Sequence, residues 1–169
     1  MSDELDNNTE VKPRPGFLTV LCVLSFISTG LGLVSGLFNV FSGPSSSEQM
    51  LQAKVEMTKS VTEMKSLGMQ SLADMLDKIQ LMSEEINNNF YLASIISLII
   101  VIVGLYGVFL MWKGLKQGFH FYIVYCLLTI ASIYIYVSPS NIPSVVVIFN
   151  LLLSGLFILM YSRNLKWMK

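Results

Sequence analysis

Charged residues are scarce in this sequence, and acidic residues are absent after Glu85. Only 13% of the residues are charged and 53% are apolar, with a mean hydropathy of +0.63. Soluble domains carry about 25% charged residues, so this composition excludes an ordinary water-soluble domain. The acids fall in two groups, one in the first ten residues and one between Glu48 and Glu85. We therefore expect a membrane protein whose acidic groups are confined to two segments.

Residue types that support catalysis or metal binding are also few. His120 is the only histidine, and Cys22 and Cys126 are the only cysteines. A single imidazole between Phe119 and Phe121, with no acid, cysteine or second histidine nearby, favours an interfacial anchor over a metal ligand or a catalytic base. No phosphate-binding loop, nucleophile elbow or zinc-protease motif occurs, and a net charge of zero argues against nucleic-acid binding. We expect no enzymatic activity, no cofactor, no metal and no nucleic-acid partner.

Four long apolar runs without charge are present, at residues 17–41, 90–112, 119–137 and 144–162. A bilayer core requires about 20 residues of helix, and each run is long enough. The first run is too long for the apolar part of a signal peptide, which favours an uncleaved anchor. We predict an all-α protein with four transmembrane helices in the lipid bilayer.

The distribution of Lys and Arg predicts the orientation of these helices, because basic residues in short flanks are retained in the cytoplasm. Basic residues lie before the first span, between the second and third, and after the fourth, whereas the turn at residues 138–143 carries no charge. We predict a flexible cytoplasmic tail at residues 1–16, a basic cytoplasmic tail at 163–169, and an extra-cytoplasmic segment at 42–89.

This external segment has the pattern of an amphipathic helix that is broken near Gly68. Gly68 occupies the position where the first half of the pattern expects an apolar residue, and the pattern resumes with an offset of four residues. An unbroken helix of this length could not return to a neighbouring span, so we predict two helices in a hairpin. The hairpin could stand off the membrane or lie along its surface, and its acidic composition favours the first arrangement. Its predicted apolar face consists of Met57, Val61, Met64, Leu72, Met75, Ile79, Met82 and Ile86.

Small and polar residues within the spans suggest how the helices pack. Ser28, Gly32 and Gly36 recur at intervals of four residues and predict a close helix contact, within one bundle or between two copies. Small residues in the second span indicate that the first two spans pack together. Asn150 is the most deeply placed amide, and we predict that it ties two helices by a hydrogen bond rather than contacting a substrate.

Two stretches, RPGFLTVLCVLSFISTG from Arg14 and MWKGLKQGFHFYIVY from Met111, resemble a family of small, uncharacterised four-helix integral membrane proteins of bacteroidete-type bacteria. The resemblance covers the spans and not the acidic insert. His120 and Phe121 depart from the tyrosine-rich residues expected at this turn. The resemblance implies an inner-membrane location and brings no known activity.

These observations predict a non-enzymatic structural or interaction component of the membrane. The external hairpin would recognise a membrane or periplasmic protein, or a second copy in a homo-oligomer. The alternative is a small permease or channel for a neutral or apolar solute, although no Asp, Glu, Lys or Arg lies within the spans to mark an ion route.

Overall fold

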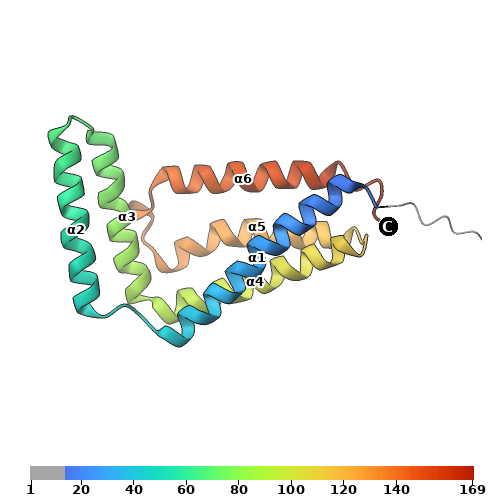
Figure 1. Cartoon of the computed structure of the whole chain (residues 1–169), viewed down its shortest axis with the longest axis horizontal. Coiled ribbons are helices and arrows are strands. Elements are labelled where there is room, and N and C mark those ends of the chain that lie inside the picture. The colour runs from blue at the N-terminus through green and yellow to red at the C-terminus, as the bar shows by residue number, and fades with distance from the viewer. Residues whose placement is uncertain (1–13) are drawn as a thin grey trace, which may run out of the picture.

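The computed structural model describes residues 14–169, and the first 13 residues, which include most of the predicted flexible tail, lie outside it. This part of the chain contains six α-helices, one 3-10 turn and no strand (Figure 1). The elements are α1 (Gly16–Ser42), α2 (Ser47–Ser66), α3 (Gln70–Asn88), α4 (Phe90–Trp112), α5 (Gln117–Tyr136), η1 (Pro139–Asn141) and α6 (Ser144–Ser162). The prediction of an all-α fold is confirmed for the described residues.

Four of these helices, α1, α4, α5 and α6, are long and apolar enough to cross a membrane. The helices α4 and α6 coincide with the predicted segments 90–112 and 144–162, whereas α1 is one residue longer at each end than 17–41. Helix α5 begins two residues before the predicted 119 and ends one residue before 137. These small differences arise because the polar residues that flank an apolar run can continue its helix.

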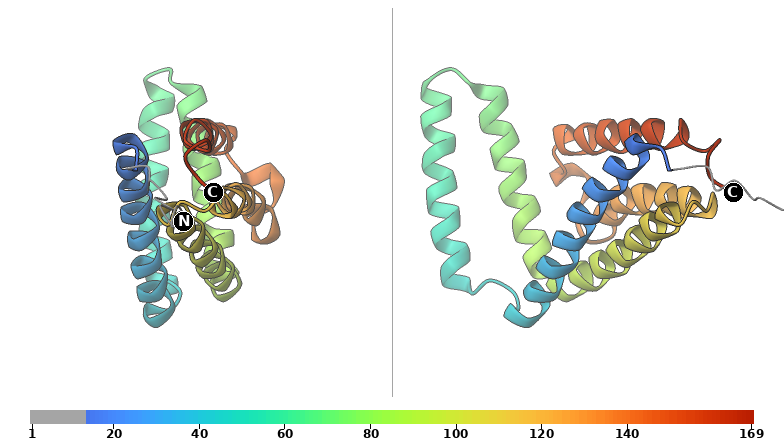
Figure 2. Two further views of the ribbon diagram at one scale, coloured as in Figure 1. Left: turned by 90° about the vertical axis from the view of Figure 1, so that its right-hand side faces the viewer. Right: turned by 45° about the vertical axis from the view of Figure 1, so that its right-hand side comes forward.

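The four apolar helices form a bundle in which α4 lies between α1 and α5. Helix α6 packs against α5 and approaches α1 only near the end of the bundle that carries both Gly16 and the C-terminus (Figures 1 and 2). We call this the terminal end and the opposite end, which carries α2 and α3, the hairpin end.

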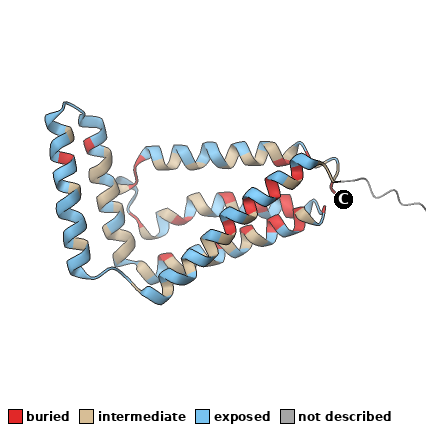
Figure 3. Cartoon of the chain, viewed as in Figure 1, coloured by how far each residue is buried: buried red, intermediate tan, exposed pale blue. Residues whose placement is uncertain are grey.

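The buried core is concentrated at the terminal end, as Figure 3 shows. Leu18, Leu21, Met111 and Tyr161 are fully buried there. The outward faces of the same helices remain apolar and exposed, including Phe41, which is 88% exposed, and Leu152, which is 67% exposed. Apolar surfaces of this extent are typical of a membrane or protein interface.

Contacts between distant segments close the terminal end. The Arg14 guanidinium lies 4.0 Å from the centroid of the Trp112 ring and donates a hydrogen bond to the Trp112 carbonyl oxygen. The backbone N–H of Lys116 donates to the Lys169 carbonyl at 2.9 Å, and that of Lys169 donates to the Gly114 carbonyl at 2.7 Å. The segment after α6 is thereby joined to the turn between α4 and α5.

Helices α2 and α3 form an antiparallel hairpin, whose two arms lie side by side in all views. The long axis of this hairpin runs across the end of the bundle and not along it (Figures 1 and 2). This direction agrees better with the alternative expectation, a hairpin that lies along the membrane surface, than with a hairpin that stands off it. Asn89 separates α3 from α4 at this point, and two hydrogen bonds fix the direction: Asn89 Nδ2 donates to the Tyr136 carbonyl at the end of α5, and the Ser138 backbone N–H donates to Glu85 of α3.

Candidate functional site

The hairpin is a preformed structure with defined helix ends. Helix α2 begins with a capping box, in which the Ser46 hydroxyl accepts from the Gln49 backbone N–H and the Gln49 side chain accepts from the Ser46 backbone N–H. The helix ends at Ser66, and Gly68 follows with a φ of 76°. That left-handed conformation is costly for residues other than glycine, so the turn forms where the sequence pattern breaks.

The interior of the hairpin is narrow and contains few fully buried residues. Val61 of α2 is 4% exposed and Ala73 of α3 is 0% exposed. Leu72 belongs to the predicted apolar face but is 45% exposed, because the turn places its neighbour Ala73 toward α2. The other members of that face are half-buried: Met57, Met64, Met75, Ile79, Met82 and Ile86.

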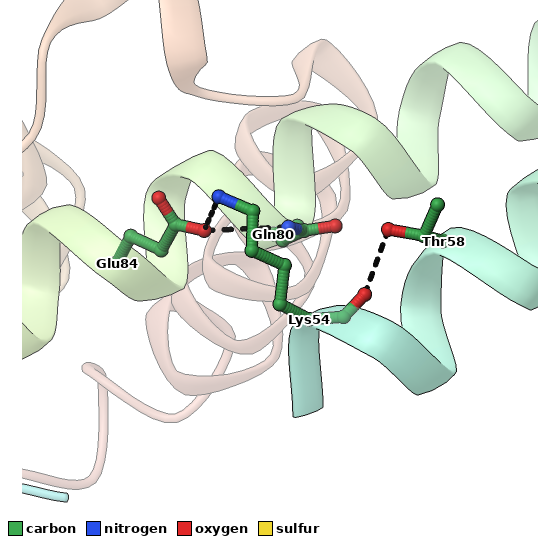
Figure 4. A network of polar contacts seen from close by, with 4 residues as sticks. All are labelled: Lys54, Thr58, Gln80 and Glu84. Carbon is green, nitrogen blue, oxygen red and sulfur yellow. Dashed lines mark hydrogen bonds and ion pairs between the residues drawn. The ribbon is translucent and has the colours of Figure 1, made fainter. Parts of the chain in front are cut away.

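Polar side chains link the two arms along their length. Lys54 Nζ of α2 lies 3.0 Å from Glu84 Oε1 of α3, and Gln80 Nε2 donates to the same oxygen at 3.3 Å (Figure 4). The hydrogen bond from Lys54 lowers the pKa of the Glu84 carboxyl. A second pair joins Lys65 Nζ and Asp77 Oδ2 at 3.3 Å nearer the turn.

A cluster of hydrogen bonds fixes the base of the hairpin to the bundle. The Glu85 carboxylate accepts from the Ser138 backbone N–H at 2.5 Å and from Asn141 Nδ2 at 2.7 Å. Asn89 Nδ2 donates to the Tyr136 carbonyl at 3.1 Å. The hydrogen bond from the Ser138 backbone lowers the pKa of the Glu85 carboxyl. We call Glu85, Asn89, Ser138 and Asn141 the basal latch.

Sequence reasoning did not assign a role to Glu85. The residue belongs to an acidic helix, and its partner turn lies more than fifty residues later in the chain. The sequence contained only a weak indication of this contact. The uncharged turn SPSNIP has backbone N–H groups and one side-chain amide that can donate hydrogen bonds to a carboxylate. Nothing in the spacing paired this turn with Glu85.

The distal half of the hairpin leaves the bundle and exposes apolar side chains. A cavity of about 300 Å³ separates Ser71, Met75 and Lys78 of α3 from the start of α6 at Pro143–Val145. Around the turn, Leu67 is 70% exposed, Met69 is 39% exposed and Leu72 is 45% exposed. We call these three residues the hairpin tip, which reaches past α6 in Figure 1.

Two of the three residues predicted to form one small-residue face pack against α4, and the third, Ser28, lies elsewhere. A Cβ added at Gly32 would lie 3.5 Å from Val101 of α4, and one at Gly36 would lie 2.8 Å from Leu98 of α4. Both glycines therefore allow close approach of α1 and α4. Ser28 is exposed and lines a cavity beside α5 and α6. The separation arises because each four-residue step turns by about 40° beyond a full turn of the helix.

Asn150 does not form the interhelical tie that the sequence suggested. Its Nδ2 donates to the Val146 carbonyl of the same helix at 2.8 Å, which is the only hydrogen bond of this side chain to a described residue. An amide can satisfy one donor within its own helix, so a partner helix is not required. Asn150 lines the same cavity as Ser28.

The remaining candidate groups lie apart from one another. Cys22 and Cys126 are buried and not joined in a disulfide. Within residues 14–169, no three His, Cys, Asp or Glu side chains come together in a way that could hold a metal ion. His120 Nδ1 lies 3.2 Å from the Lys116 carbonyl at the terminal end.

A bundle of four long apolar helices with one docked helical hairpin defines the class of this protein. The chain belongs to the family described as Domain of unknown function (DUF8777), whose model matches residues 11–147. The match covers α1 to η1 and ends within the first turn of α6. Neither the search of curated proteins nor the search of solved structures gives a match.

Proposed function

We propose that this chain is a non-enzymatic integral membrane protein that recognises another protein through its external hairpin. The observation that carries the proposal is the combination of a fixed base and an exposed apolar tip. The basal latch holds α3 across the end of the bundle, and Leu67, Met69 and Leu72 are presented beyond it. An apolar surface on a preformed element can bind with little ordering cost, and methionine suits tolerant recognition.

The proposed orientation places both termini in the cytoplasm of a bacterial cell and the hairpin outside the inner membrane. The basic residues of the described chain that flank the spans, including Arg14, Lys113 and Lys169, gather at the terminal end, and the acids of residues 14–169 lie on the hairpin. Retention of basic flanks in the cytoplasm supports this orientation, and the family resemblance of the spans supports the inner membrane.

A permease or channel for a neutral solute is the competing proposal. It requires a route through the terminal end of the bundle. Leu18, Leu21 and Tyr161 are fully buried in a packed cluster at that end, which argues against a continuous path. Recognition through the hairpin therefore explains more of the structural features than transport does.

Photocrosslinking in cells tests the proposal. A photoreactive amino acid at Leu67 or Leu72 should yield adducts with a second protein or with another copy of this chain. The same residue at Leu152, which lies on the outward face of α6, serves as the control and should yield lipid adducts. Absence of protein adducts from both tip positions would overturn the recognition role.

Topology reporters test the orientation separately. A reporter inserted after Gly68 should be active outside the cytoplasm, and one fused at Lys169 should be active inside. The reverse result would contradict the orientation. It would not decide the recognition role of the hairpin, which the crosslinking experiment tests.

A further inference from the structure

A cleft between α1, α5 and α6 places polar side chains near the middle of three apolar helices. Its volume is about 200 Å³, and its polar lining consists mainly of Ser28, Thr29, Tyr125, Thr129, Asn150 and Ser154. Polar groups at the midplane of a membrane are costly and mark binding sites in many membrane proteins. In this protein three helices supply such polar groups, all at the same depth in the bundle.

The shape of the cleft gives access from the side. Helices α1 and α6 lie close together at the terminal end and diverge toward the hairpin end (Figures 1 and 2). At the closed end, Tyr161 Oη donates to Ser25 Oγ at 2.9 Å and both residues are buried. Leu24 and Leu153 of the lining are 49% and 42% exposed, so the cleft is closed at this end and opens sideways between α1 and α6.

The donors and acceptors that remain free in the lining determine which ligand groups can form hydrogen bonds in the cleft. Thr29 donates to the Ser25 carbonyl at 2.7 Å, and Thr129 donates to the Tyr125 carbonyl at 2.8 Å. Their hydroxyl hydrogens are thus engaged, and their oxygen lone pairs are left to accept. Ser28 and Asn150 retain hydrogens that can be donated. A ligand with both a donor and an acceptor satisfies this arrangement, and no charged side chain among residues 14–169 lines the cleft.

We propose that this cleft binds the uncharged hydroxyl group of a membrane lipid. The volume is below the roughly 300–1,000 Å³ of pockets that enclose whole ligands, so the cleft holds the hydroxyl-bearing head and the start of a chain. The rest of the chain extends through the lateral opening into the bilayer. This inference rests on membrane insertion but not on the recognition role of the hairpin.

The test uses the full-length protein in phosphatidylcholine nanodiscs with a diacylglycerol that carries a diazirine in one acyl chain. This probe should label α1, α5 and α6 around the cleft, and unlabelled diacylglycerol should compete. The acetylated probe, which has no hydroxyl donor, should label the cleft about tenfold less. Equal cleft labelling by both probes would overturn the proposal.

A double variant, Ser28→Ala with Asn150→Leu, should lower cleft labelling by about tenfold. Ser97→Ala is the matched control, because Ser97 is exposed on α4 away from the cleft, and it should label as the wild type does. If the double variant fails to fold, Ser28→Ala alone gives the same comparison. Unchanged cleft labelling in these variants would overturn the proposal.

Labelling of Leu152 on the outward face of α6 reports membrane insertion. Both probes should label it in every variant, since it requires only contact with acyl chains. Absence of this signal would overturn membrane insertion and the cleft proposal together, whereas its presence with no cleft signal would overturn the cleft proposal alone.

Discussion

At the terminal end of the bundle, helices are held by close backbone approach and buried aromatic rings, whereas the hairpin end is held by a few hydrogen bonds. Tyr161 and Met111 are fully buried at the terminal end, but Glu85 and Asn89 of the basal latch lie at the surface. Buried packing contributes more free energy than solvent-exposed polar contacts. The comparison indicates that the terminal end is held more strongly than the hairpin end, whose attachment depends on the basal latch.

The strongest test of this comparison is Gly118→Ala at the contact between α4 and α5. A Cβ at Gly118 would lie 2.5 Å from the Met111 backbone nitrogen and 2.6 Å from the Gly107 carbonyl oxygen. Because backbone atoms cannot move aside cheaply, we expect a loss of about 3 kcal/mol in the free energy of unfolding. Thermal unfolding in detergent measures this change.

Gly155→Ala is the matched control for that substitution. Nothing lies within 4 Å of a Cβ added at Gly155 of α6, and alanine favours the helix, so the variant should melt at or above the wild-type temperature. Equal losses in both variants would contradict the view that close packing is concentrated between α4 and α5.

Arg14→Lys should weaken the terminal end by a smaller amount. The Arg14 guanidinium stacks on Trp112 at 4.0 Å and lies 5.9 Å from the Trp167 ring centroid. A lysine ammonium lacks the planar surface for this stacking, and we expect a loss of about 1 kcal/mol. Thermal unfolding and tryptophan emission report it, and the exposed Lys166→Ala should leave both unchanged.

Glu85→Gln tests the hairpin end and should affect docking more than global melting. The variant keeps the side-chain shape but replaces the carboxylate that accepts hydrogen bonds from Ser138 and Asn141. The neutral amide oxygen of glutamine is a weaker acceptor than a carboxylate oxygen. We expect faster amide exchange at Ser138 and a broader distribution of distances between spin labels on the hairpin and α6. Glu84→Gln, which alters a contact between the two arms, should leave those distances unchanged.

The same latch predicts a dependence on pH. Because the folded-state pKa of Glu85 lies below its ordinary value of 4.5, its contribution to docking is fully present above that value. Docking weakens as the pH falls through the lowered pKa. The wild-type spin-label distances should therefore broaden in acid, at pH values below 4.5, and Glu85→Gln should remove most of this change. If the variant showed the same broadening in acid, the pH dependence would have to come from a titratable group other than Glu85.

The elements of the fold, the packing of α1 on α4 and the pairing of α2 with α3 could be predicted from sequence, but the direction of the hairpin and the position of α6 could not. Length and apolarity identify four helices that are able to span a membrane, and Gly68, which interrupts the apolar pattern, predicts the break between α2 and α3. The direction of the hairpin depends on Glu85 bonding a turn more than fifty residues away. No local pattern encodes that pairing.

The same distinction applies to individual residues in the spans. Gly32 and Gly36 indicated a close contact, but only tertiary structure places them against Val101 and Leu98 of α4. Ser28 and Asn150 were predicted as packing residues, and the structure instead brings both to the lining of the cleft. Their role depends on the divergence of α1 and α6, which neither helix specifies alone.

The smallest expected effect is that of Asp77→Asn within the hairpin. The ion pair between Lys65 and Asp77 spans 3.3 Å, and its side chains are 44% and 45% exposed, so its removal should cost less than about 0.5 kcal/mol. Thermal unfolding should barely distinguish this variant from Asp74→Asn, which lacks a partner on α2. A larger, salt-sensitive loss for Asp77→Asn would mean that charge, and not the burial of Val61 and Ala73, holds the arms together. In that case the hairpin end would respond to ionic strength as well as to pH.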